Sequence, residues 1–278
     1  MAEELQLRVY GEANLPTLIF LPGIHGDWTL ISSFRRALGN RVRFVEITYP
    51  RTLTWSLDDY AAGVEDALFK IGITSGWLLG ESFSSQVVWP LVARNKFQTE
   101  GVIIAGGFVK HPMTWAIRCA DRIGSGALLS FLIGIMFVGA SAVYAKVARW
   151  RFRHSPETLA NINEFIARRT PLDREAGKHR LRLIGGNDPR AIAKNLRLPL
   201  FAISGSMDPI VPWINIRWWL SRHCPALREY KIIWQADHNV LSTAANEAAD
   251  QIVKWISEGR VPRVPKLKLE THGTRPSD

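Results

Sequence analysis

The sequence predicts an α/β fold in which a mostly parallel, doubly covered β-sheet has helices on both faces. Short apolar runs typical of buried strands alternate along the chain with amphipathic stretches of helical period. Strand–helix–strand units of this kind build parallel sheets. The chain has 278 residues, 47% of them hydrophobic, which is long enough to bury such a sheet. The ordinary apolar fraction and the presence of only two cysteines exclude a disordered chain and a disulfide-stapled miniprotein.

The individual elements follow from the pattern of apolar residues. The expected strands are short, largely apolar runs at residues 17–21, 42–48, 77–79, 102–105, 200–204 and 230–234. The expected helices are residues 57–71, 84–94, 212–221 and 240–256. In the first of these helices, Leu57, Tyr60 and Val64 share one face, and Gly72 marks the end.

The alternation stops between residues 107 and 195. No strand pattern is visible there, and Ser155-Pro156-Glu157 has the composition of a helix start. We therefore expect residues 1–106 and 196–258 to form one core, with 107–195 inserted as an all-helical cap, or lid. The last segment, 259–278, is basic and contains proline, and we expect it to be disordered.

The motif with the most chemical content is Gly80-Glu81-Ser82-Phe83-Ser84, which lies between an expected strand and an expected helix. A sharp strand-to-helix turn exposes its central residue above the sheet, and the helix N-terminus favours developing negative charge. Small residues two positions before and after let the turn close, although Ser84 stands where a second glycine is more usual. The context predicts that Ser82 is a nucleophile.

A serine nucleophile needs a base and an acid that orients the base. Asp208 and His238 each follow an expected strand, so both reach the edge of the sheet where Ser82 is expected. Asp237 is the other candidate for the acid, but adjacent residues on a loop rarely direct their side chains at each other. We predict a catalytic triad of Ser82, Asp208 and His238.

Acyl transfer also requires backbone N–H groups that stabilise an oxyanion. One is expected from Phe83, directly after the nucleophile. The second is expected in the glycine-bearing turn Leu21-Pro22-Gly23-Ile24-His25-Gly26-Asp27, where we choose Ile24 and keep His25 as the alternative.

Together these segments resemble a bacterial-type serine hydrolase of the α/β-hydrolase superfamily. The resemblance rests on Leu21-Pro22-Gly23-Ile24-His25-Gly26, on Gly80-Glu81-Ser82-Phe83-Ser84, on the run from Gly205 to Pro212, on Asp237-His238, and on the chain order of the triad. It implies about eight strands and a helical cap, and the early Leu-Pro-Gly is similar to thioesterase-like, lipase-like and esterase-like members. It implies no particular substrate.

The remaining features concern the surroundings of the site. Residues 127–145 form an uncharged apolar stretch, which cannot cross a membrane without separating Ser82 from Asp208 and His238. Buried cap core and a membrane-docking lid remain alternatives. The formal charge is +10, and residues 107–195 hold 15 basic and 6 acidic residues. Basic and aromatic residues also alternate at 146–154, which suits an anionic membrane surface.

The predicted function is hydrolysis of a small-molecule ester or thioester with a hydrophobic acyl part. An acyltransferase or perhydrolase with the same triad is one alternative, and a peripheral membrane or partner-binding protein with a vestigial site is another. We expect no cofactor, no metal and no nucleic-acid partner. The acidic N-terminus and the distant cysteines, Cys119 and Cys224, favour a cytoplasmic protein, with or without peripheral membrane contact.

Overall fold

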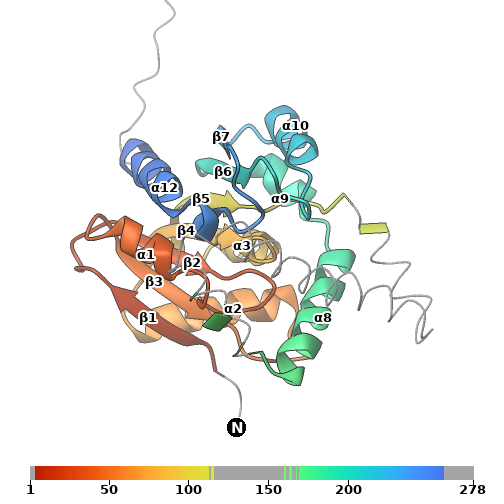
Figure 1. The fold of residues 1–278 in the computed structure, drawn as a ribbon, viewed down its shortest axis with the longest axis horizontal. Helices are drawn as coiled ribbons and strands as arrows, with labels where there is room; N and C mark the ends of the chain where they lie inside the picture. The colour runs from red at the N-terminus through yellow and green to blue at the C-terminus, as the bar shows by residue number, and fades with distance from the viewer. Residues whose placement is uncertain are drawn as a thin grey trace, which may run out of the picture.

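The computed structural model describes residues 4–112, 114–115, 160, 163–164, 167 and 169–259. A seven-stranded sheet lies at its centre, with strands in the order β1-β3-β2-β4-β5-β6-β7 (Figure 1). The strands are β1 (Gln6–Tyr10), β2 (Thr17–Leu21), β3 (Arg43–Thr48), β4 (Ser75–Glu81), β5 (Gln98–Ala105), β6 (Leu200–Gly205) and β7 (Leu227–Ile233). β1 pairs antiparallel with β3, and all other pairs are parallel. The α/β class and the six expected strands are confirmed.

Helices cover both faces of the sheet (Figure 1). One face packs on α2 (Leu57–Lys70), α3 (Ser84–Arg94), α8 (Pro171–Gly186), α9 (Arg190–Asn195) and α10 (Trp213–His223). The other packs on α1 (Ser32–Leu38), α11 (Val240–Thr243) and α12 (Ala245–Gly259). Neighbouring strand residues point to opposite faces: Ile19 and Leu21 face the first set of helices, and Leu18 and Phe20 face the second.

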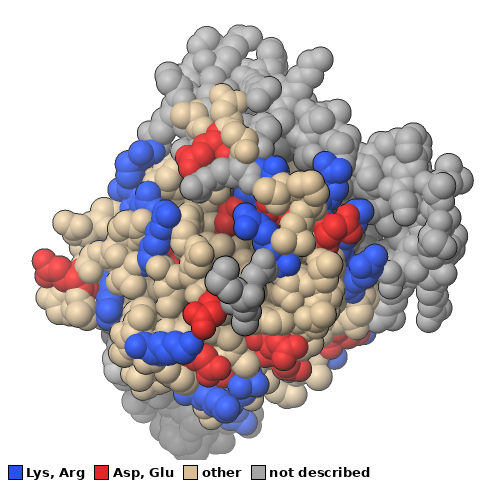
Figure 2. Space-filling model, turned by 90° about the horizontal axis from the view of Figure 1, so that it is seen from below, with Lys and Arg blue, Asp and Glu red and all other residues tan. Residues whose placement is uncertain are grey.

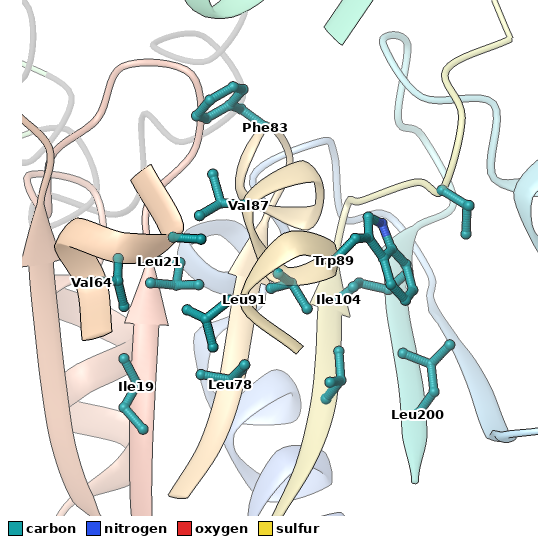
Figure 3. Close-up of a cluster of buried hydrophobic side chains, with 14 of the residues drawn as sticks. Ile19, Leu21, Val64, Leu78, Phe83, Val87, Trp89, Leu91, Ile104 and Leu200 are labelled. Atoms are coloured by element: carbon teal, nitrogen blue, oxygen red, sulfur yellow. The ribbon is translucent and has the colours of Figure 1, made fainter. Parts of the chain in front are cut away.

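The core between α2, α3 and the sheet holds the start of α3 in place. Figure 3 shows Leu78, Val87 and Leu91 packed between helix and sheet, with Phe83 at the beginning of α3. Phe83 is fully buried and meets Tyr49 and Tyr60 edge to face, with ring centroids 6.2 and 5.7 Å away. The residue after Ser82 is therefore an anchor for the turn.

The sheet of the described residues has seven strands, against the about eight that the resemblance implies. Other expectations require correction. The helix expected over 240–256 is divided into α11 and α12, because Ala244 leaves the helical conformation at φ −136° and ψ 47°. The sequence pattern also missed β1 and α1. β1 lies at the sheet edge and is largely exposed, and its five residues contain no run of consecutive apolar residues like those that mark the buried strands.

The described part of 107–195 includes α8 and α9, and the helix start at 155–157 lies outside the described residues. The apolar stretch 127–145, the basic run 146–154, Cys119 and residues 260–278 lie outside them as well. Among the helices that the structure does describe, none is long and apolar enough to cross a membrane. On the described part of the face seen in Figure 2, basic and acidic side chains are interspersed.

Candidate active site

Ser82 stands on the turn between β4 and α3. Its backbone has φ 49°, an uncommon conformation for a residue with a side chain. Its N–H donates to the carbonyl of Ala105, and its carbonyl accepts from Ser85 N–H at 3.0 Å. The strained turn expected from the sequence is therefore present, held by a neighbouring strand on one side and the first helical turn on the other.

Three residues far apart in the sequence form one hydrogen-bonded chain. His238 Nε2 lies 2.8 Å from Ser82 Oγ, and His238 Nδ1 lies 2.8 Å from Asp208 Oδ2. A carboxylate only accepts hydrogen bonds, so Nδ1 carries the proton and Nε2 is the acceptor for the serine hydroxyl. The structure thus places the imidazole between the carboxylate and the hydroxyl in the orientation that a general base needs.

The loop after β6 holds Asp208 in place. Its Oδ1 accepts from the N–H groups of Ile210 and Val211, both at 2.9 Å, which leaves Oδ2 directed at His238. The Asp208 side chain is fully buried. Asp237 has a different position: its Oδ1 accepts from Asn239 N–H and Thr243 Oγ1, so it braces the loop that carries His238.

The protonation of His238 depends on the charges around it. Burial lowers the pKa of His238, but the carboxylates of Asp208, Glu81 and Asp237 together raise it by more, with Asp208 contributing most. The pKa of His238 is therefore raised above its usual value. Burial also raises the pKa of Glu81 to about 7, against the opposing effect of His238.

Gly106, directly after β5, lets His238 approach the sheet closely. Its φ is +54°, and a Cβ at this position would lie 2.7 Å from the carbonyl oxygen of His238 and 3.4 Å from Nδ1. Any side chain here would displace the histidine loop.

The turn after β2 lies against the nucleophile. A Cβ at Gly23 would be 3.6 Å from the Cβ of Ser82, and Gly23 N–H donates to Glu81 Oε2 at 3.3 Å. Ile24, the expected second oxyanion donor, follows directly, and the side chain of His25, the alternative donor, is exposed. The turn that carries Ile24 and the start of α3 that follows Phe83 thus meet at Ser82.

Sequence reasoning missed the link between this turn and the nucleophile. Ser84 is fully buried, and its Oγ donates to the Pro22 carbonyl and lies 2.7 Å from Tyr49 Oη. Because a serine has one hydroxyl hydrogen, Tyr49 is the donor in the second bond. Ser84 was expected only to be small enough to fit, whereas its hydroxyl also joins the two loops of the site.

No family model matches the chain, and no curated protein matches it. Solved structures do. An esterase from Thermogutta terrifontis is 17% identical with a TM-score of 0.72, covering 92% of this chain and 94% of its own. An enol-lactonase from Burkholderia xenovorans is 19% identical with a TM-score of 0.70, covering 91% and 96%. A bromoperoxidase from Bacillus anthracis is 15% identical with a TM-score of 0.70, covering 91% and 95%. The chain has the α/β-hydrolase fold.

An α/β-hydrolase fold places its nucleophile at the strand-to-helix turn that Ser82 occupies here. In the described part of the chain, no group of three or more His, Cys, Asp and Glu side chains is arranged to hold a metal ion.

Proposed function

We propose that the protein is a serine hydrolase that cleaves a carboxylic ester or thioester through an acyl-enzyme. The observation that carries the proposal is the hydrogen-bonded chain from Ser82 Oγ through His238 to Asp208, with both distances at 2.8 Å. The hydroxyl is at hydrogen-bonding distance from a base whose proton is already on the far nitrogen.

The reaction follows from this arrangement. Ser82 Oγ attacks the substrate carbonyl while His238 Nε2 takes its proton, and the imidazolium is stabilised by Asp208. His238 then returns the proton to the leaving alcohol or thiol as the carbonyl–heteroatom bond breaks. Water, deprotonated by the same nitrogen, attacks the acyl-enzyme and releases the acid and Ser82.

The backbone N–H groups of Phe83 and Ile24 receive the negative charge of the tetrahedral intermediate in this proposal. Phe83 is the N-cap residue of α3, whose N-terminus adds a favourable dipole. Loss of one such donor typically costs about 100- to 1,000-fold in kcat.

The hydrophobic acyl part of the proposed substrate is supported by a groove of about 850 Å³ between the segment after β5 and helix α10. Its apolar lining residues are Val109, Pro112, Trp115, Ile214, Ile216, Trp218 and Trp219. His111, also in the lining, contacts the carbonyl of Ile210 in the loop that carries Asp208, and this contact supports the groove as the acyl site. The esterase and enol-lactonase with this fold also favour an ester bond as the target.

Measured turnover of nitrophenyl esters and acyl thioesters of increasing chain length tests the proposal. Ser82→Ala should lower turnover by more than about 1,000-fold, because the nucleophile is lost. Ser257→Ala is the matched control, since Ser257 is exposed on α12. Undiminished turnover in Ser82→Ala would refute the proposal.

Transfer to an acceptor other than water is the second proposed outcome, because an acyltransferase and a perhydrolase share the acyl-enzyme. Adding an alcohol or hydrogen peroxide to the same assay distinguishes the acceptors. The peripheral membrane alternative rests on residues 127–154, which lie outside the described residues, and stays a prediction. Flotation with anionic liposomes tests it, and no binding at low salt would contradict it.

A further inference from the structure

Arg180, on helix α8, reaches from the inserted segment into the core beneath the turn that carries Ile24. It is 1% exposed, and its guanidinium makes three described hydrogen bonds. Nη1 donates to the Ile24 carbonyl at 2.9 Å, Nη2 to the Pro50 carbonyl at 2.9 Å, and Nε to Tyr60 Oη at 3.2 Å. All three acceptors are neutral oxygen atoms. A guanidinium buried among neutral acceptors is costly to keep, which points to a functional role for its position.

We propose that Arg180 is a positioning residue that sets the Ile24 N–H for oxyanion stabilisation. The inference rests on the proposed function. It connects the inserted segment to the reaction through the backbone of the turn, with no contact to the substrate.

The hydrogen bonds of the turn show why Ile24 depends on Arg180. The peptide between Pro22 and Gly23 is held at both ends, by Ser84 Oγ on its carbonyl and by Glu81 on its N–H. The next peptide joins Gly23 to Ile24. Its carbonyl, which belongs to Gly23, accepts a hydrogen bond from Gly26 N–H at 2.9 Å. Because the N–H and C=O of a trans peptide point in opposite directions, Ile24 N–H points away from that bond. No acceptor among the described residues is bonded to it.

The peptide after Ile24 is the one that Arg180 holds. Its carbonyl is the acceptor of Nη1, so the guanidinium fixes the rotation of the backbone on the far side of the Ile24 Cα. The approach is close: a Cβ at Gly26 would lie 2.5 Å from Nη1. Without this bond, only the hydrogen bond on the Gly23 carbonyl would hold the orientation of the Ile24 N–H.

A second arginine from the inserted segment, Arg169, binds a side chain at the end of the same turn. Arg169 Nη2 donates to Asp27 Oδ2, and Asp27 Oδ1 accepts from Thr29 N–H at 3.0 Å. Arg169 and Arg180 therefore hold the turn at two points. Among the described hydrogen bonds, the one to the backbone unit next to the expected oxyanion donor comes from Arg180, so it is the residue to test.

Arg180→Lys is the decisive variant, because lysine keeps the charge but cannot reach three acceptors with a planar fork. Arg94→Lys is the matched control: Arg94, the last residue of α3, bonds Glu65 of α2 through Nε at 2.6 Å. Active sites are first titrated with a fluorophosphonate, so that kcat is expressed per reactive Ser82. A misfolded fraction then lowers the titre and leaves kcat unaffected.

We expect kcat per active site to fall about 10- to 100-fold in Arg180→Lys, a part of the loss seen when a donor is removed. KM should stay within about two-fold, since ground-state binding does not use the oxyanion donor. The affinity for a trifluoromethyl ketone, which forms an oxyanion on Ser82, should fall by the same factor as kcat.

Unchanged kcat per active site, a loss confined to KM, or unchanged trifluoromethyl ketone affinity would each overturn the inference. A comparable loss of kcat in Arg94→Lys would also overturn it. These results differ from failure of the proposed function, in which wild-type protein would show no ester hydrolysis that depends on Ser82.

Discussion

Replacing Ser84 by alanine should destabilise the protein far more than loss of one small hydroxyl suggests. Ser84 Oγ lies in the interior between two groups, donating to the Pro22 carbonyl and accepting from Tyr49 Oη. Tyr49 is 3% exposed and Ser84 is fully buried, so water cannot replace the lost bonds. The variant leaves one buried acceptor and one buried donor without a partner.

The expected cost follows from the number of unpaired groups. Each buried polar group left without a hydrogen bond costs about 1–3 kcal/mol. Two such groups give a loss of about 2–6 kcal/mol in the free energy of unfolding. Tyr49→Phe in the Ser84→Ala background removes the unpaired hydroxyl, so the double variant should be more stable than the sum of the two single variants implies, by about 1 kcal/mol.

Urea unfolding followed by tryptophan fluorescence measures these free energies. Ser257→Ala, on the exposed face of α12, should stay within about 0.5 kcal/mol of wild type. The reasoning is refuted if Ser84→Ala is as stable as Ser257→Ala, or if the two single-variant losses are additive.

Three further predictions follow from the site. Asp208→Asn should lower kcat by about 10,000-fold, because the amide favours the wrong histidine tautomer. Glu81→Gln should move the acidic limb of the kcat/KM profile to lower pH: the Glu81 charge raises the pKa of His238, and the base acts when deprotonated. Gly106→Ala should destabilise the protein by about 2–4 kcal/mol, from the positive φ and from overpacking, and should lower kcat by displacing His238.

Matched variants check each of these predictions. Asp237→Asn, which keeps a bracing oxygen, should retain activity within about ten-fold, and an equal loss in both variants would contradict the role of Asp208. If the acidic limb of the kcat/KM profile of Glu81→Gln stays at the same pH or moves to higher pH, the electrostatic argument is contradicted. Gly72→Ala also has positive φ, +73°, but meets nothing within 4 Å, so it should cost only the roughly 1–2 kcal/mol of backbone strain.

The sequence was sufficient to predict the parallel sheet and the meeting of Ser82, Asp208 and His238. Each of these residues follows an apolar strand, and the carboxyl ends of parallel strands meet at one edge of the sheet. The strand pattern is local, so it can be recognised without knowing what packs against it. β1 was not recognised, because an edge strand that is largely exposed lacks the run of apolar residues that marks the buried strands.

The supporting residues could not be predicted for the same physical reason. Arg180 bonds Ile24 across 156 positions of sequence, and in its own helix it stands in a run of basic and apolar residues with no distinguishing feature. Ser84 was recognised only as a small residue, since its two bonds depend on how the turn after β2 and the residue after β3 pack on α3. Such roles appear only once distant segments are placed together.

The most direct test of the account is mass spectrometry of the protein after reaction with an activated ester and with a fluorophosphonate. We expect one covalent adduct on the peptide that contains Ser82, formed in wild-type protein and absent from Ser82→Ala. An adduct that persists in Ser82→Ala, or wild-type protein that forms none, would contradict it.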